Sequence, residues 1–475
     1  MTESRDWSPA SARRMGLELG AAEEGTRIRP VLESEWLERE PALALNARRW
    51  LEAQGFRGNP GTFAYVPDGD GMPGEVWLGI ATESAVGDIA RLSGAASAGR
   101  YHVQGSEGAG GSALGWDQIV IGWALGNYGF DLDGACSDAK AVLHVPDIPE
   151  VSTALNRAAA IRLTRDLINV PAQDLGPASL SAAAQSIAAR FGSRAEEIVG
   201  EALLKRNFPA VHAVGRAGAE LPRLVDFRWG SPDHPMVTLV GKGVCFDTGG
   251  LNVKPMAGMR HMKRDMGGAA VVLGLAQLIM SEALPVNLRV LLPIVENAIA
   301  GNAMRPGDVV STRDGTTIEI ENTDCEGRMI LADALTAASE DDPDLVIDCA
   351  TLTGSARTAF GGEIQALFAS DDALGQTLQA SSIASGDPLW HMPLWPGYRK
   401  RIDAPVGDLL NMAPGGYAGA ITAALFLAHF ARETRAWVHL DMSAWNDSPQ
   451  PGCPVGGEAT GLNALFDFLR ARYGS

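Results

Sequence analysis

Two kinds of apolar run alternate along the second two-thirds of the chain. Short runs rich in β-branched residues are typical of buried parallel strands, and longer runs that are apolar on most faces predict buried helices. The predicted strands are 236–240, 287–295, 344–350 and 436–442, and the predicted helices are 153–168, 179–191, 269–283, 329–340 and 419–433. This alternation predicts an α/β fold around a mostly parallel central sheet flanked by helices.

The first 150 residues carry a weaker pattern. Residues 1–30 are polar, small and charged, which favours a frayed terminus. The apolar spacing predicts a helix over 34–53 and strands over 75–80, 117–122 and 141–145. A proline- and acid-containing junction at 146–152 is the predicted linker. We therefore expect a small, non-catalytic N-terminal α/β domain over 1–150 and a larger, catalytic α/β domain over 151–475.

Two polar connections follow predicted strands of the larger domain. The first contains Gly241, Gly243, Gly249 and Gly250, which allow positive φ and close approach of a ligand. Its charged residues are Lys242, Asp247, Lys254 and Asp265. The second follows the strand-like stretch 317–321 and carries Asp324, Glu326 and Arg328. Their alternate spacing predicts an extended loop that points all three side chains in one direction.

The four carboxylates of these connections predict a metal site. Charged side chains are seldom buried without partners, and bound cations would offset that cost. Open α/β sheets bind ligands at the carboxyl ends of their strands, where both connections lie. Oxygen-rich ligation with few histidines and no paired cysteine spacing suits two divalent ions. Two simpler interpretations remain open from the residues alone: Asp265 as a helix cap, and Lys242 in an ion pair with Asp247.

Five separated motifs carry a resemblance to a known family. They are Gly241–Gly250, Lys254–Pro255, Met262–Met266, Asn322–Arg328 and Ala350–Gly354. In this order they resemble the leucyl aminopeptidase family, the dinuclear metallo-exopeptidases of family M17, with Cys325 in place of the usual alanine. The resemblance covers residues 155 to 475. It implies an aminopeptidase that removes N-terminal residues, leucine-like or otherwise apolar, from peptides with a free N-terminus.

The resemblance also implies roles for individual residues. Lys242, Asp247, Asp265, Asp324 and Glu326 are the expected ligands of two divalent ions, Zn²⁺ or Mn²⁺, with Asp247 and Glu326 bridging both. A water held between such ions loses its proton near neutral pH and attacks the scissile carbonyl.

The other implied roles concern the substrate. Lys254 is expected to stabilise the oxyanion, and Arg328 to hold a bicarbonate that transfers the proton. Asp265 and one metal are expected to bind the α-amine. The expected pocket for the first side chain is lined by Met262, Thr351, Leu352 and Gly354. The chain departs from the family over Met442–Trp445, which leaves the size of that pocket open. The family implies a homohexamer.

Composition narrows the possible partners and compartments. A net charge of −18 argues against nucleic acid, which requires a basic surface. The five cysteines (136, 245, 325, 349 and 453) show no paired spacing, which favours a reducing compartment. No signal-peptide core or apolar run of about 20 residues occurs, so we expect a cytoplasmic protein without a membrane partner.

Three functions of other classes remain to be weighed. A different dinuclear hydrolase, such as a phosphoesterase, would need several further anion-binding cations. A DNA-binding regulatory role, which the family resemblance also suggests, is opposed by the acidic net charge. A metal-binding scaffold without turnover would not need Lys254 and Arg328 beside a full set of ligands.

Overall fold

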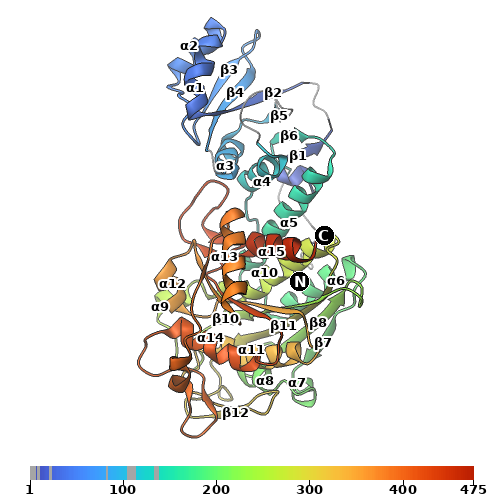
Figure 1. Cartoon of the computed structure of the whole chain (residues 1–475), viewed down its shortest axis with the longest axis vertical. Helices are drawn as coiled ribbons and strands as arrows, with labels where there is room; N and C mark the ends of the chain where they lie inside the picture. Colours follow the sequence, from blue (N-terminus) through green and yellow to red (C-terminus); the bar gives the residue numbers. More distant parts are fainter. Residues whose placement is uncertain are drawn as a thin grey trace. The chain divides into compact units, whose positions relative to one another are not determined.

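The computed structural model describes Trp7 and residues 11–20, 24–81, 84–103, 114–132 and 138–474. The chain forms two compact units (Figure 1). The smaller comprises Pro9–Arg162 and Ser448–Val455, and the larger comprises Leu163–Asp447 and Gly456–Ser475 together with Trp7. Helix α5 (Pro149–Asn169) begins within the predicted linker, and the units divide within this helix. The boundary at 150/151 stays a prediction.

The smaller unit contains a six-stranded sheet in the order β1-β6-β5-β2-β4-β3. All neighbours are parallel except β3 and β4. Its strands are β1 (Leu17–Leu19), β2 (Thr26–Leu32), β3 (Phe63–Pro67), β4 (Pro73–Ile80), β5 (Gly99–Val103) and β6 (Ala141–Val145). The strands predicted over 75–80 and 141–145 are confirmed. Part of the terminus that was expected to fray is ordered in strands, because residues 17–19 lie in β1 and residues 26–30 lie in β2, where Thr26, Ile28 and Val31 are buried.

Helices cover this sheet, and one of them corrects a prediction. They are α1 (Glu33–Arg39), α2 (Leu45–Ala53), α3 (Val86–Ala95) and α4 (Trp116–Gly126), with 3-10 turns η1 (Arg13–Met15) and η2 (Glu40–Ala42). The helix predicted over 34–53 is interrupted after η2. The strand predicted over 117–122 is wrong, since these residues lie in α4. A short, continuous apolar run does not distinguish a buried strand from a buried helix. Gly122 and Gly126 favour the helix, because they let α4 pack closely against the backbone of α3.

A segment from near the end of the chain completes the smaller unit. Ser448–Val455 belongs to this unit, although the residues on both sides of it belong to the larger one. A Cβ added at Gly452 would lie 2.8 Å from Cβ of Ala90 in α3 and 3.2 Å from Cβ of Leu125 in α4. Gly452 therefore packs closely against both helices.

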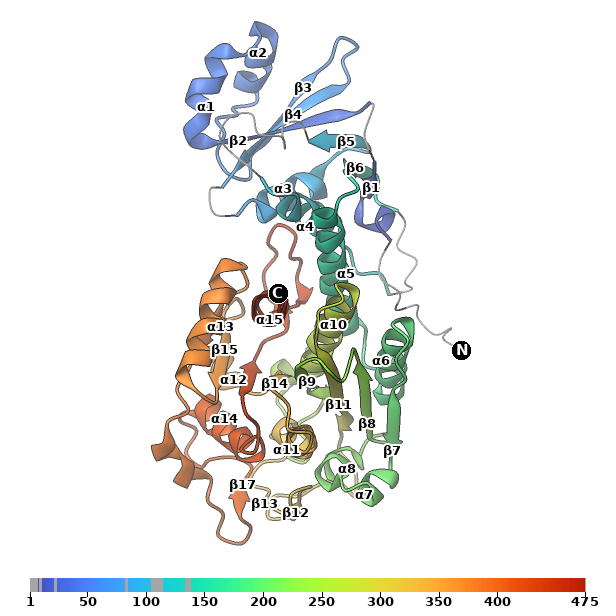
Figure 2. The same ribbon diagram turned by 45° about the vertical axis from the view of Figure 1, so that its right-hand side comes forward.

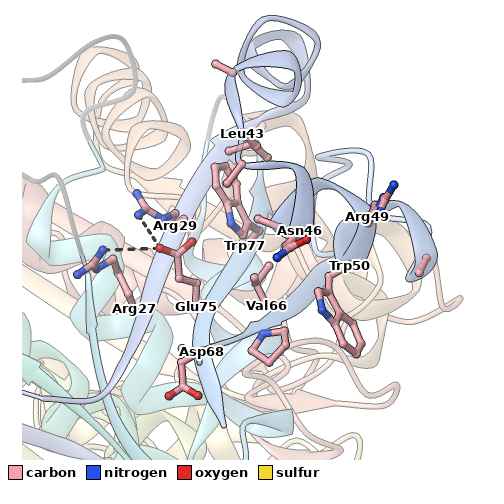
Figure 3. A pocket seen from close by; sticks show the side chains of 16 residues that line it. Arg27, Arg29, Leu43, Asn46, Arg49, Trp50, Val66, Asp68, Glu75 and Trp77 are labelled. Carbon is pink, nitrogen blue, oxygen red and sulfur yellow. Dashed lines mark hydrogen bonds and ion pairs between the residues drawn. The ribbon is translucent and has the colours of Figure 1, made fainter. Parts of the chain in front are cut away.

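The smaller unit also contains an open hollow of about 980 Å³ between β2, β3, β4 and α2 (Figure 3). Arg27 and Arg29 share Glu75 at 3.6 and 2.6 Å, and the three side chains lie on one wall. Arg49 and the half-exposed Trp50 line it from α2. The hollow holds none of the predicted site residues.

The larger unit is built on a nine-stranded sheet (Figure 2). Its path is β16-β15-β18-β14-β9-β11-β8-β7, with β10 beside β11. Its strands are β7 (Glu196–Val199), β8 (Arg223–Trp229), β9 (Met236–Gly241), β10 (Gly243–Asp247), β11 (Asn287–Asn297), β14 (Leu345–Ala350), β15 (Gln365–Ala369), β16 (Leu389–His391) and β18 (Trp437–Asp441). The central neighbours are parallel, and antiparallel pairs occur at β7–β8, β8–β11 and β15–β18.

Helices pack on both faces of this sheet. They are α6 (Pro177–Arg190), α7 (Ala202–Lys205), α8 (Pro209–Gly215), α9 (Met256–Met259), α10 (Gly267–Ser281), α11 (Glu326–Ser339), α12 (Gly354–Phe360), α13 (Asp372–Ala384), α14 (Gly419–Phe430) and α15 (Leu462–Tyr473), with 3-10 turns η3 (Met262–Met266) and η4 (Pro396–Ile402). Helix α10 contacts α6 and α15, whereas α11 contacts α8 and α14. The predicted α/β class and all five predicted helices are confirmed.

Short strands complete the larger unit. They are β12 (Val309–Ser311), β13 (Thr317–Glu319), β17 (Leu409–Leu410), β19 (Trp445–Asn446) and β20 (Gly456–Gly457). Among the described residues, no helix is long and apolar enough to cross a membrane. Cys245, Cys325 and Cys349 are free thiols, and Cys136 lies outside the described residues.

Candidate active site

The carboxyl ends of the central parallel strands bring the predicted site residues together. Lys242 joins β9 to β10, and β10 ends at Asp247. Strand β11 ends at Asn297, and Thr351 follows the last residue of β14. Because these strands are parallel neighbours, the residues after their carboxyl ends meet at one edge of the sheet.

Lys242 lies at the centre of the site and is only 2% exposed. Its Nζ lies 2.8 Å from Oδ1 of Asp265 and 3.0 Å from Oε1 of Glu326. It also donates a hydrogen bond of 2.7 Å to the carbonyl oxygen of Thr351. Gly327 leaves space for this side chain, because a Cβ there would lie 2.5 Å from Cε of Lys242.

Lys254 is the cation that contacts Asp247. Its Nζ lies 2.8 Å from Oδ2 of Asp247 and 2.5 Å from Oδ1 of Asp324. The ion pair between Lys242 and Asp247 that was weighed above is therefore not the arrangement found. Each lysine instead joins two carboxylates from different segments of the chain.

Asn297 belongs to the site, although it was not among the predicted site residues. The side chain is 3% exposed, and its Nδ2 donates to Oδ1 of Asp247 at 2.7 Å. The same nitrogen lies 3.4 Å from Oε2 of Glu326. Asn297 therefore fixes the two carboxylates relative to each other. Its position could have identified it in the sequence, because Asn297 is a polar residue at the carboxyl end of the apolar strand β11. Lys242 lies at the same edge of the sheet, after the neighbouring parallel strand β9.

Helix α11 corrects the prediction for the second polar connection. The helix begins at Glu326, so Asp324, Glu326 and Arg328 do not lie in one extended loop. A carboxylate in the first turn of a helix is stabilised by the helix dipole, which the alternate spacing did not reveal. Arg328 is 5% exposed and donates from Nη1 to the carbonyl oxygen of Asn411 at 2.6 Å. Its buried Nε has no hydrogen-bond partner among the described residues.

The turn after β14 forms another wall of the site. Asp441, 2% exposed at the end of β18, accepts hydrogen bonds from the backbone N–H groups of Leu352 and Thr353 at 3.1 and 3.0 Å. It also accepts one from Oγ1 of Thr353 at 2.6 Å. A Cβ added at Gly354 would meet no atom within 4 Å, so this residue borders open space. Asp441 thereby sets the position of the turn.

All eleven predicted site residues line one cavity of about 770 Å³. They are Lys242, Asp247, Lys254, Met262, Asp265, Asp324, Glu326, Arg328, Thr351, Leu352 and Gly354. The fold therefore brings these residues together in one cavity, and the roles assigned to them remain predictions.

Burial and mutual repulsion perturb the carboxylates. Burial, followed by the charge of Glu326, raises the pKa of Asp247 to about 7. Burial also raises the pKa of Asp265, although Lys242 opposes it. Burial acts in the same direction on Glu326, but Lys242 and Lys254 outweigh it and lower the pKa of this carboxyl. Two ammonium groups therefore do not fully neutralise four carboxylates.

The donor set fits divalent cations. Oxygen atoms of the buried Asp247, Asp265 and Glu326 lie within 4.8 Å of one another. When all four carboxylates are ionised, they exceed the two ammonium groups by two negative charges, and clustered carboxylates are the ligands that hard divalent ions prefer. The site therefore gains stability from bound cations.

The segment Met442–Trp445, where the chain departs from the family, has an unusual backbone. Ala444 has a φ of 50°, in the left-handed region that residues with a Cβ rarely adopt. Its side chain is buried against α10, because a Cβ at Gly267 would lie 2.4 Å from Cβ of Ala444. Met442 and Ser443 line the cavity.

Two family models match the chain. The model for the cytosol aminopeptidase family, catalytic domain, matches residues 162–466, and the model for the M17 aminopeptidase N-terminal domain matches residues 27–146. The resemblance seen in the sequence stopped at residue 155, so the second match extends it. A probable cytosol aminopeptidase of Syntrophotalea carbinolica is 39% identical over 369 residues, which cover 74% of each chain. A peptidase B of Serratia proteamaculans is 41% identical over 318 residues, covering 65% of this chain and 74% of the relative.

Solved structures agree with these matches. The cytosol aminopeptidase from Coxiella burnetii has a TM-score of 0.91 and 42% identity, covering 96% of this chain and 99% of that one. The bottromycin maturation enzyme BotP in complex with Mn has a TM-score of 0.85 and 33% identity, covering 94% and 99%. The phosphoesterase, DNA-binding and non-catalytic alternatives are not favoured. The chain belongs to the cytosol aminopeptidase family, M17, and is a metal-dependent aminopeptidase.

Proposed function

We propose that Asp247, Asp265, Asp324 and Glu326, together with Lys242 as a neutral amine, would hold two divalent cations, Zn²⁺ or Mn²⁺; nearby cations would lower the pKa of the lysine and so favour the neutral form. The observation that carries the proposal is the buried cluster of Asp247, Asp265 and Glu326. The side-chain amide of Asn297 contacts both Asp247 and Glu326 and so holds these two carboxylates in place. When bound there, such ions lower the pKa of a coordinated water and polarise the scissile carbonyl.

Lys254 stabilises the oxyanion that develops on the scissile carbonyl. Its ammonium group lies in the cavity between Asp247 and Asp324, on a side chain that is 15% exposed. A fixed cation in a partly dry site stabilises developing negative charge strongly, because it needs no reorganisation during the reaction.

Arg328 would hold a bicarbonate, which would supply a group for proton transfer. Support comes from its burial, its unpartnered Nε and the lack of an ion pair to any carboxylate in the described part of the chain. A buried guanidinium in this situation suits a small anion that can accept hydrogen bonds side by side.

The pocket beside these groups selects the end of a peptide. Asp265 receives the free α-amine, and Thr351 orients that carboxylate by donating to its Oδ1 at 2.8 Å. Met262, Leu352 and Gly354 accept the first side chain, so leucine-like residues are released from peptides with a free N-terminus.

Aminopeptidase activity with and without chelation tests the proposal. Chelation should abolish hydrolysis of leucine amide, and Mn²⁺ or Zn²⁺ should restore it; full activity in a verified metal-free preparation would refute it. Asp265→Asn should lose bound metal and kcat/KM together. An N-acetylated peptide should be inert, and hydrolysis equal to that of its free-amine parent would exclude recognition of the α-amine.

The response to added bicarbonate distinguishes the role of Lys254 from that of Arg328. Removing Lys254 takes away a donor used mainly in the transition state, so Lys254→Ala should lower kcat by roughly 10²–10³ and leave KM less affected. In carbonate-depleted buffer, added bicarbonate should accelerate the wild type and Lys254→Ala but not Arg328→Ala. A normal bicarbonate response in Arg328→Ala would reduce Arg328 to a structural residue.

The assembly is a homohexamer and the compartment is the cytoplasm. The membership of the chain in this family supports both, and exposed apolar side chains beside the cavity support the first. Leu251, Val253 and Met256 are 41%, 52% and 88% exposed in the single chain. Light scattering in solution tests the assembly, since a monomer at micromolar concentration would contradict it.

A further inference from the structure

The hollow of the smaller unit combines cationic and apolar side chains, and the proposed mechanism does not use it. Side chains of β2 and β4 form one wall, and helix α2 forms another (Figure 3). Its volume of about 980 Å³ is sufficient for a small organic molecule. The charges and apolar surfaces of these walls therefore decide which molecules the hollow can hold.

The strand wall presents two arginines to the hollow. Successive side chains of a strand point to opposite faces of the sheet, so Arg27 and Arg29 of β2 share a face. The parallel register places Glu75 beside Arg27, and the buried Trp77 beside Arg29. The guanidinium of Arg29 lies 5.7 Å from the centre of the Trp77 ring. Two guanidinium groups therefore lie around one carboxylate, next to an aromatic side chain.

Glu75 is bound by Arg29 and compensates Arg27 only weakly. Nη2 of Arg29 donates to Oε1 of Glu75 at 2.6 Å. Nη1 of Arg27 lies 3.6 Å from the same oxygen, which is beyond hydrogen-bond distance. On the other side of Arg27, its neighbour in register is His102 of β5, which brings no negative charge. Within the described residues Arg27 makes no hydrogen bond, and its side chain is 39% exposed, so its terminal N–H groups are available to an anion.

The other charged groups of the hollow do not supply that anion. Oδ1 of Asp68 accepts hydrogen bonds from the backbone N–H groups of Asp70 and Met72, both at 2.9 Å, and so stabilises the turn between β3 and β4. Arg49 lines the hollow from α2 and adds a third guanidinium group. Three guanidinium groups and two carboxylates leave one positive charge in excess, in a protein whose net charge is −18.

Helix α2 adds apolar surface beside this positive charge. Asn46, Arg49, Trp50 and Ala53 follow one another at spacings of three and four residues, so they share one face of the helix. All four line the hollow. The indole of Trp50 is 51% exposed, and an aromatic or branched apolar group that covers it removes apolar surface from water. The hollow therefore offers an aromatic surface and an undercompensated guanidinium in the same space.

We propose that this hollow binds a small organic carboxylate that carries an aromatic or branched apolar group. Arg27 receives the carboxylate, and Trp50 packs against the apolar group. Arg29, which Glu75 holds in place, adds positive charge beside the carboxylate. A single excess positive charge matches a monoanion, and the planar guanidinium matches the geometry of a carboxylate. The site lies wholly in the smaller unit and does not depend on the proposed catalytic roles.

Isothermal titration calorimetry with N-acetylphenylalanine tests this inference. The probe has a carboxylate and an aromatic ring but no free α-amine, so it is not a substrate of the proposed aminopeptidase. We expect one site per chain with a Kd of about 1 mM or tighter, as the size of the probe implies. N-acetylphenylalaninamide lacks the carboxylate and N-acetylalanine lacks the ring, so each should bind roughly 10-fold more weakly.

Matched substitutions locate the bound probe. Arg27→Gln should weaken binding about 10-fold or more, and Arg27→Lys should recover part of it. Trp50→Ala should weaken binding to a similar extent. Arg48→Gln and Leu45→Ala remove a charge and an exposed apolar side chain from α2 outside the hollow, so both should bind the probe as the wild type does. Thermal melts show whether each variant is folded, and Arg27→Lys and Trp50→Ala decide the outcome if Arg27→Gln is not.

Lys254→Ala distinguishes the hollow from the catalytic cavity, because a carboxylate is also a ligand for divalent ions. This variant should bind the probe with wild-type affinity, and a loss there without a loss in Arg27→Gln would overturn the inference. Equal binding of the amide, or no saturable binding up to about 10 mM, would also overturn it. Inorganic phosphate should not displace the probe at equal concentration; if it does, the hollow recognises a small oxyanion without an apolar group and the inference is wrong.

Discussion

Gly327→Ala adds one methyl group at the point where the lysine of the site passes helix α11. A new Cβ would lie 2.5 Å from Cε and 2.8 Å from Nζ of Lys242. Since carbon atoms make ordinary contacts at about 3.5 Å, the lysine must retreat by about 1 Å. Its contacts of 2.8, 3.0 and 2.7 Å to Asp265, Glu326 and Thr351 would then lengthen beyond good hydrogen-bond geometry.

The expected loss follows from the strength of these contacts. Hydrogen bonds that involve a charged group contribute about 1.5–3 kcal/mol each, and loss of one or two weakens the hold on Lys242 by about 2–5 kcal/mol. A displacement of this size at a catalytic centre lowers kcat/KM roughly 10²-fold. Steady-state kinetics on leucine amide, combined with metal analysis by mass spectrometry, measures the effect.

Gly87→Ala is the matched control. Gly87 also lies in a helix, α3, and a Cβ there would meet no atom within 4 Å. Alanine is favoured over glycine in helices by about 1 kcal/mol, so both substitutions improve helix propensity and only Gly327→Ala meets the lysine. Wild-type kcat/KM and metal content in Gly327→Ala would refute the assignment of Lys242 to the metal site.

Three further predictions concern the support of the site. Ala444→Gly should change the free energy of unfolding by less than about 0.5 kcal/mol, because relief of the left-handed φ offsets the loss of the buried methyl group. The control Ala276→Gly, in helix α10, loses both a buried methyl group and helix propensity and should lower the free energy of unfolding by about 1.5–2 kcal/mol. Thermal melts of the two variants measure the difference. Burial lowers the pKa of His439, but the carboxylate of Asp348 at 2.6 Å outweighs burial and raises the pKa above 6.5. The stability that this pair contributes is therefore present below pH 6.5 and is lost as the pH rises through the folded pKa. The melting temperature should fall more steeply above pH 6.5 in the wild type than in His439→Gln. Asp441→Asn should raise KM several-fold by loosening the turn after β14, with metal content unchanged.

The sequence predicted the larger unit well because its elements are buried on most sides. Runs such as 236–240 and 269–283 are apolar enough that tertiary packing agrees with local pattern, and β9 and α10 lie within two residues of them. The run at 117–122 is equally apolar, but its glycines pack α4 against α3, a contact that spacing alone does not encode.

For the site, the sequence predicted the residues better than their partners. Charged residues beside glycines after apolar strands can be found in a sequence, so Lys242 and Asp247 were selected. The pairing of lysines with carboxylates depends on where the neighbouring strands end relative to one another, which the sequence does not show. Lys242 contacts Asp265 instead of Asp247. Asn297 was missed because a neutral amide at the end of a strand has no charge to reveal it.

The discontinuous smaller unit has a consequence for biosynthesis. Its residues up to Arg162 leave the ribosome first, but Ser448–Val455, which packs through Gly452 on Ala90 and Leu125, is made almost at the end. At ~5–20 residues per second the delay is roughly 15–60 s. During that time the surfaces of α3 and α4 that receive the segment are uncovered and open to chaperones. Release of a full-length chain, not emergence of the first domain, therefore completes the N-terminal fold, and a nascent chain stalled before residue 448 should be more sensitive to protease in α3 and α4 than the finished protein.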